Sequence, residues 1–309
     1  MASYGTKYYI SPLIGLFGSY NYKEITKRDY EKLIKATNIL LAALNFEESF
    51  QIIISNHIDY ETYIFKDSFQ KSMQQLGEQQ LTNIRVEANR YISNTLASIY
   101  NYLQYGNRCI KTITKKDLFN EKKNEFLKKH TVFSFMNELR HYNQHYGFAA
   151  PAFEIFRGIK EVDGNQYLET KIKPSVKLSS LKSDSDFYDY YKQTGKENPE
   201  LDKIRKDSIN NLLEENDSDM RDITILFRTF LDQLWNMHKQ IRDKVGIKVS
   251  SQVEHLQVTG KEILNKDALS YFDGFEVSKS IDGINNSTAI PIRIIYEYKS
   301  IIKKYNIIA

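Results

Sequence analysis

The stretch Glu138-Leu139-Arg140-His141-Tyr142-Asn143-Gln144-His145-Tyr146-Gly147 closes a long segment of helical periodicity, and the rest of the chain is organised around it. It gathers one arginine, two histidines and two carboxamides ahead of a glycine. Arginine carries a planar, permanent charge that matches a phosphate, and histidine both accepts and donates protons near neutral pH. This combination of side chains supplies what cleavage of RNA without a metal requires.

Three long helices are predicted up to and through this stretch, because apolar residues recur at spacings of three and four. The first begins at the capping pattern Thr26-Lys27-Arg28-Asp29 and the third at the similar Thr114-Lys115-Lys116-Asp117. Gly106 is the predicted C-cap of the second helix, and Gly147 and Pro151 end the third. The predicted ranges are about 26–65, 67–105 and 114–146.

The pattern changes after the third helix. Strand-like segments on either side of Asp163-Gly164-Asn165 predict a β-hairpin. Pro199 is expected at the first position of another helix, and Asp219 is expected to open a last long helix that Gly246 closes. In the tail, residues 290–305 fit both periods, and helix is favoured.

These elements predict a mainly α fold: an antiparallel helical bundle with a β-hairpin excursion after the motif helix and a C-terminal extension. The expected parts are an N-terminal arm (1–25), a helical domain (26–245) with the excursion at about 152–182, and a mixed extension (246–309). The composition agrees, since 41% hydrophobic and 27% charged residues are typical of a globular protein. A net charge of +4 is compatible with nucleic acid without a histone-like excess.

The cellular setting follows from what the sequence lacks. Cys109 is the single cysteine, which excludes an internal disulfide and fits a reducing cytosol; with no histidine near it in sequence, it is expected to be a packed thiol. The N-terminus has no signal-peptide pattern, and no apolar run approaches the roughly 20 residues that cross a bilayer. A soluble cytoplasmic protein with no membrane partner is therefore expected.

On an ideal helix, Arg140 and His145 are separated by roughly 140°, so one helix does not easily aim both at the same atom. Either the last turn unwinds near Gly147, or a two-fold dimer places Arg140 of one subunit near His145 of the other. In both cases the partial negative charge at the helix end favours protonated His145, and its imidazole is a usable general acid or base.

These residues resemble the signature of the HEPN superfamily: an arginine, a polar residue such as histidine, and a final histidine with four to six residues between it and the arginine. Arg140-His141-x-x-x-His145 matches at the shortest spacing. The flanking helices, over about 26–245, also fit that family's bundle. The resemblance implies an endoribonuclease with no metal or other cofactor, working as a homodimer with both motifs at one cleft. It also implies a toxin or effector in antiviral or abortive-infection defence, with an antitoxin or other defence protein as a possible partner.

The resemblance gives each residue a role. Arg140 would hold the scissile phosphate and stabilise its developing charge, His145 would be the general acid or base, and His141 would orient or assist. Asn143 and Gln144 are candidates for contacting the RNA. Lysines preceding the motif are expected to be a solvated face or to steer RNA towards the cleft; they are Lys115, Lys116, Lys122, Lys123, Lys128 and Lys129.

Other interpretations remain open. Arg140 and His145 are also compatible with ordinary surface groups at a helix end, and the whole chain with a non-catalytic helical RNA-binding or protein-interaction module. His141-x3-His145 has the spacing of two zinc ligands, for which His130 and Glu138 are the nearest candidates for a third. Two further histidines on apolar stripes, His57 and His238, are expected to lie in the core.

Overall fold

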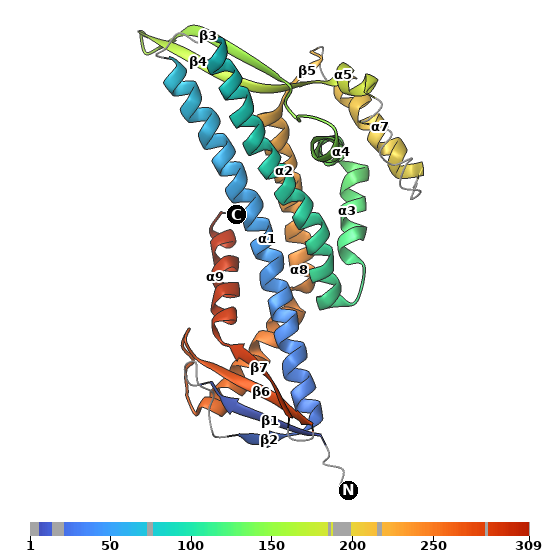
Figure 1. Cartoon of the computed structure of the whole chain (residues 1–309), viewed down its shortest axis with the longest axis vertical. Coiled ribbons are helices and arrows are strands. Elements are labelled where there is room, and N and C mark those ends of the chain that lie inside the picture. The colour runs from blue at the N-terminus through green and yellow to red at the C-terminus, as the bar shows by residue number, and fades with distance from the viewer. Residues whose placement is uncertain are drawn as a thin grey trace. The chain divides into compact units, whose positions relative to one another are not determined.

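The computed structural model describes residues 6–13, 22–72, 77–184, 187, 199–214, 218–281 and 284–308. This part of the chain is mainly helical, with two small antiparallel sheets (Figure 1), so the predicted helical class is confirmed. The helices are α1 (Lys27–Ser72), α2 (Glu78–Thr114), α3 (Leu118–Lys129), α4 (Thr131–His145), α5 (Leu178–Ser183), α7 (Pro199–Glu214), α8 (Ile223–Leu264) and α9 (Arg293–Ile308). The strands are β1 (Lys7–Pro12), β2 (Lys23–Ile25), β3 (Ala152–Val162), β4 (Asn165–Lys177), β5 (Met220–Asp222), β6 (Gly274–Ile281) and β7 (Ile284–Pro291).

Helix α1 begins where its capping pattern predicts. The backbone N–H of Asp29 donates to the Thr26 hydroxyl at 3.1 Å, and that hydroxyl donates to the Asp29 carboxylate at 2.7 Å. The predicted boundary near residue 66 is wrong, because α1 continues to Ser72 and α2 starts at Glu78. Gly106 is not a C-cap: it is buried inside α2, whose apolar face continues through Ile110 and Ile113.

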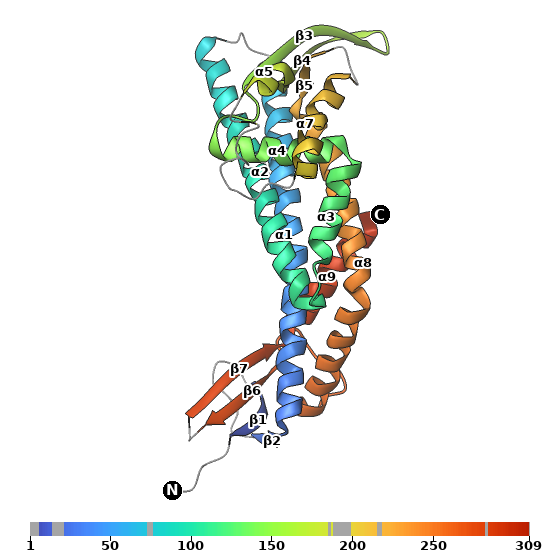
Figure 2. The same ribbon diagram turned by 90° about the vertical axis from the view of Figure 1, so that its right-hand side faces the viewer.

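The predicted third helix is two helices. The pattern at Thr114 marks a turn, in which the Thr114 hydroxyl accepts from the backbone N–H of Lys116 and α3 starts only at Leu118. His130 then adopts an extended conformation, with φ −124° and ψ 108°, and separates α3 from α4. Every residue of α4 from Phe133 to Arg140 is buried, and α7 packs against this helix (Figure 2). A helix buried all round has no single apolar stripe, so periodicity does not reveal the break.

The β-hairpin is confirmed. Strands β3 and β4 pair in register from Ala152↔Ser175 to Val162↔Asn165. Asp163 and Gly164 between them have φ of 52° and 75°, the left-handed pair that a tight two-residue hairpin turn requires.

The predicted limits of the last long helix are wrong at both ends. Asp219 does not open it, because its carboxylate accepts from the backbone N–H of Ser179 at the start of α5, at 2.8 Å. Residues 220–222 instead pair with β4 as strand β5, and α8 begins at Ile223. Gly246 does not close it, because buried residues extend its apolar face through Leu256 and the helix runs to Leu264.

The N-terminal arm and the tail form one sheet, in the order β2-β1-β6-β7. Ile10 of β1 pairs with Val277 of β6, and Phe275 of β6 pairs with Ile290 of β7; all four residues are buried. The helix favoured in the tail is present as α9, but the residues up to Pro291 belong to a strand that the sequence did not predict.

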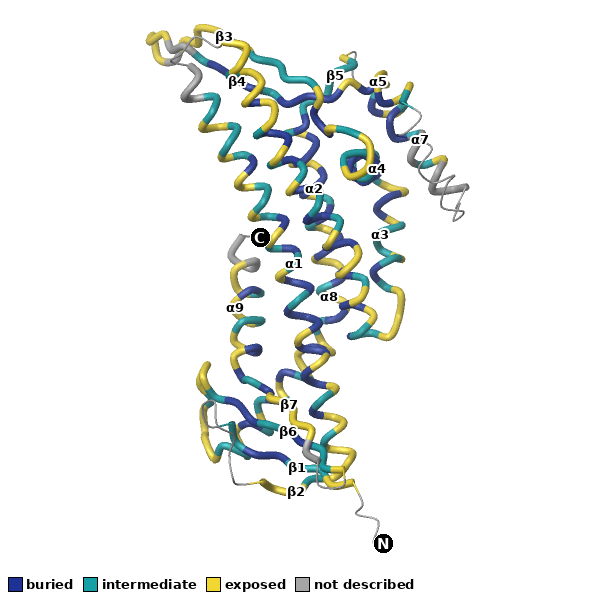
Figure 3. Tube along the Cα trace, viewed as in Figure 1, coloured by how far each residue is buried: buried dark blue, intermediate teal, exposed yellow. Residues whose placement is uncertain are grey.

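The chain divides into two compact units, to both of which α1, α2 and α8 contribute. Unit 1 comprises residues 1–48, 105–118 and 242–309, and unit 2 comprises 49–104 and 119–241. Figure 3 shows the buried residues along each helix. In unit 2, Phe50 and Tyr102 pack around His238, which is fully buried and contacts the Tyr102 hydroxyl through Nδ1 at 2.9 Å. The prediction that His238 is a core histidine is confirmed.

Candidate functional site

Arg140 lies in the interior of unit 2. Only 3% of the residue is exposed, and its guanidinium carbon stands 4.8 Å from the centre of the Tyr100 ring on α2. Nη2 donates to the side-chain oxygen of Asn137 at 3.3 Å and contacts Nε2 of His141 at 2.7 Å. Because a guanidinium only donates hydrogen bonds, His141 Nε2 is the acceptor, and the ring in this contact is neutral with its proton on Nδ1.

His145 is at the opposite extreme of burial. It is the last residue of α4 and is exposed, as is Gln144 beside it. The helix keeps its geometry to this point, since the backbone N–H groups of Tyr146 and Gly147 both donate to the carbonyl of Tyr142, at 2.8 and 3.2 Å. Of the two alternatives for bringing Arg140 and His145 together, unwinding before Gly147 is therefore not seen. The structure brings Arg140 and His141 together, but it places Arg140 inside and His145 on the surface.

Asn143 fixes the chain that follows the motif. Its side-chain oxygen accepts from the backbone N–H of Ala149 at 3.1 Å, and its amide donates to Ser93 on α2 at 3.1 Å. Asn89, also on α2, holds Ala150 in the same manner. These bonds give Asn143 a structural role, which a motif comparison does not reveal.

The expected basic residues Lys128 and Lys129 occupy the exposed last turn of α3. The extended residue His130 separates them from α4, so the lysines are not on the motif helix as the sequence suggested. Burial, and then the charge of Lys129, lowers the pKa of His130 below its ordinary value.

Two aromatic side chains are exposed next to His145. Tyr146 is 37% exposed and Phe148 is 58% exposed. Exposed aromatic groups beside a polar cluster are typical of a surface that contacts a partner.

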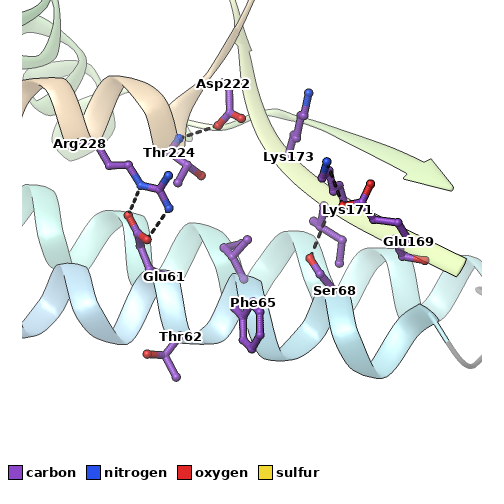
Figure 4. A pocket seen from close by; sticks show the side chains of 13 residues that line it. Glu61, Thr62, Phe65, Ser68, Glu169, Lys171, Lys173, Asp222, Thr224 and Arg228 are labelled. Carbon is purple, nitrogen blue, oxygen red and sulfur yellow. Dashed lines mark hydrogen bonds and ion pairs between the residues drawn. The ribbon is translucent and has the colours of Figure 1, made fainter. Parts of the chain in front are cut away.

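A second candidate site in unit 2 was not found from sequence. It is an open groove of about 750 Å³ between α1, β4 and the start of α8 (Figure 4). Arg228 donates to both oxygens of Glu61, each at 2.6 Å, and Glu61 also contacts Nε2 of His57 at 2.9 Å. His57 is thus a partly buried histidine at the edge of the core, and burial lowers its pKa.

The two lysines of the groove also have partners. Lys171 pairs with Glu169 at 3.1 Å, and the Lys173 ammonium lies 4.5 Å from the centre of the Phe156 ring. The groove therefore offers little free charge for chemistry. Its residues come from three distant segments, so no local sequence signal exposes it.

The described residues also bear on the zinc alternative and on the cysteine. No group of three or more His, Cys, Asp or Glu side chains is placed to hold a metal ion there. Cys109 is buried, which raises the pKa of its thiol to about 11 and confirms a packed cysteine. None of the described helices combines the length and the apolar character needed to cross a membrane.

Comparisons of the chain with family models, with curated proteins and with solved structures found no match.

Proposed function

We propose that the protein is an endoribonuclease that cleaves RNA without a metal ion, acts as a homodimer and serves as a toxin or effector in antiviral defence. The observation that carries the proposal is the arrangement at the end of α4, where exposed His145 follows buried Arg140 and the partly buried His141 that it contacts. The sequence pattern Arg140-His141-x-x-x-His145 supports it independently, through its resemblance to the HEPN superfamily.

In the proposed reaction His145 carries the proton. The neutral imidazole of one subunit takes the proton of a ribose 2′-hydroxyl, whose oxygen attacks the adjacent phosphorus. The bond from phosphorus to the 5′-oxygen breaks, and the protonated imidazole of the other subunit gives a proton to that oxygen. The products are a 2′,3′-cyclic phosphate and a free 5′-hydroxyl.

The surface beside His145 supports the dimer. Burying Tyr146 and Phe148 against a second copy removes exposed aromatic area from water, and a two-fold axis there brings two copies of His145 together. Arg140 is enclosed in the single chain, so its contact with a phosphate requires the guanidinium to leave the Tyr100 ring.

The test is incubation of the purified protein with total RNA in EDTA, followed by analysis of the product ends. We expect fragments with 2′,3′-cyclic phosphates from the wild type and none from His145→Ala. His255→Ala is the matched control, because it removes a histidine of α8 outside the motif. Equal cleavage by the wild type and His145→Ala contradicts the assignment.

The burial of Arg140 favours a second candidate, a non-catalytic helical module that binds RNA or a protein partner. In that case Arg140 is a packing residue held by Tyr100, Asn137 and His141. Intact RNA together with a mobility shift in the same incubation indicates the RNA-binding form of this alternative.

A further inference from the structure

Unit 1 contains a pocket of about 310 Å³ between the first half of α1, the end of α2 and the middle of α8. These three segments lie side by side in both orthogonal views (Figures 1 and 2). The pocket is separate from the motif of α4, and an inference from it does not rest on the proposed ribonuclease activity. Its lining residues are Tyr30, Glu31, Ile34, Lys35, Asn38, Ile39, Thr112, Ile113, Lys115 and Lys248.

Three lysines from three different segments surround the pocket: Lys35, Lys115 and Lys248. In the part of the chain that the structure describes, none of the three forms an ion pair. The single acidic lining residue, Glu31, is paired with Lys27 outside the pocket at 3.7 Å. Three lysines against one glutamate leave the lining with an excess of positive charge, which attracts an anion.

The backbone of Lys115 has a left-handed conformation, with φ of 63°. Helices commonly end on such a residue, but glycine or asparagine is preferred there because a longer side chain is strained. The third lysine that lines the pocket therefore occupies a position where its backbone conformation is unfavourable. Strained residues of this kind concentrate at ligand sites.

The floor of the pocket is apolar. Ile39 is 2% exposed and Ile113 is fully buried, and Ile34, Tyr30 and Asn38 complete the wall. An apolar floor with a cationic rim matches a small molecule that has a flat or apolar body and an anionic group. The volume lies near the lower limit, about 300 Å³, of pockets for small ligands.

We propose that this pocket binds a small phosphorylated ligand of the size of a nucleoside monophosphate, with the phosphate held by Lys35, Lys115 and Lys248. The ammonium groups supply charge-assisted hydrogen bonds to the phosphate oxygens. The apolar floor receives the uncharged body of the ligand.

Calorimetric titration of the full chain with adenosine 5′-monophosphate, adenosine and inorganic phosphate tests the proposal. We expect saturable binding of the monophosphate that weakens as salt is added, and at least tenfold weaker binding of adenosine. Lys35→Gln and Lys248→Gln should each raise Kd about tenfold. Lys244→Gln, an exposed lysine one turn away on α8 that does not line the pocket, should leave Kd unchanged.

Lys115→Gly separates loss of binding from loss of fold. Glycine removes the ammonium group and also relieves the left-handed backbone, so this variant should melt at a higher temperature than the wild type and bind the monophosphate about tenfold more weakly. No saturable binding by the wild type, equal affinity for adenosine, or an unchanged Kd in all three pocket variants overturns the proposal.

Discussion

Replacing Arg140 and His145 by alanine, one at a time, should separate the stability of α4 from its chemistry. The two residues are close in sequence, yet Arg140 is 3% exposed and His145 is exposed. Sequence alone suggests that both variants keep the fold. The structure predicts instead that only His145→Ala does so, because His145 is exposed and Arg140 is buried.

The cost of Arg140→Ala can be estimated from its contacts. The guanidinium over the Tyr100 ring contributes roughly 0.5–2 kcal/mol. Its hydrogen bonds to Asn137 and His141 involve a charged donor, and such bonds contribute about 1.5–3 kcal/mol each. The bond to Asn137 is the longer of the two, at 3.3 Å, so its contribution lies near the lower value. Allowing for non-additivity, we expect a loss of about 3 kcal/mol for Arg140→Ala, against less than about 0.5 kcal/mol for His145→Ala.

Urea unfolding followed by circular dichroism measures both losses, and the same preparations are assayed for RNA cleavage. At roughly 2 °C per kcal/mol for a chain of this size, Arg140→Ala should also lower Tm by about 6 °C. Arg140→Lys keeps the charge but loses the planar fork, so its stability should fall between the two. A loss below about 0.5 kcal/mol for Arg140→Ala refutes the interior role that we assign to it.

Three further predictions concern the scaffold. Glu47→Ala should destabilise the chain by about 3–5 kcal/mol in urea unfolding, because Arg242 then loses the buried carboxylate that its guanidinium contacts at 2.5 and 2.9 Å. The control is Glu87→Ala, which removes the carboxylate of an exposed ion pair and should cost less than about 1 kcal/mol. Burial lowers the pKa of His57 in the folded state. The unfolded chain therefore binds a proton at this histidine at a higher pH than the folded chain, and stability should fall as pH drops from 7 through about 6.5. Urea midpoints measured over a pH series test this, and a His57→Asn variant with the same pH dependence of stability as the wild type contradicts it. Gly164→Ala should lower the free energy of unfolding by about 1–2 kcal/mol, because φ at this residue is 75° and an alanine is strained there. If the variant unfolds at the wild-type Tm, the turn does not require a glycine.

The elements that the sequence predicted well are those with local signals. The Thr26–Asp29 pair is three residues apart and makes its capping contacts within one turn. Asp163-Gly164 sets the hairpin turn by its own backbone preference. In both cases the residues that carry the signal are also the residues that make the interaction.

The helix ends, strand pairs and burial that were predicted wrongly have a common cause: each depends on packing between segments that are distant in sequence. Gly106 and Gly246 resemble helix ends by local preference, but the buried faces of α2 and α8 continue past them, and packing outweighs a cost of about 1 kcal/mol per glycine. The pairing of Ile10 with Val277 joins segments from opposite ends of the chain, and no window of sequence contains both. The burial of Arg140 could not be predicted for the same reason, because it depends on Tyr100 of another helix.

The contact between Arg140 and His141 also bears on which histidine can carry a proton in catalysis. His141 accepts a hydrogen bond from a guanidinium, so protonating its Nε2 would place two cations against each other and break the 2.7 Å contact. His145 is exposed at the end of α4, away from that guanidinium contact. Of the two imidazoles on this face of the helix, His141 is the one whose protonation at Nε2 opposes the guanidinium of Arg140. This contact is the reason why the proposed cleavage assigns both proton transfers to His145 and none to His141, and a separate acid and base of that kind require two copies of the chain.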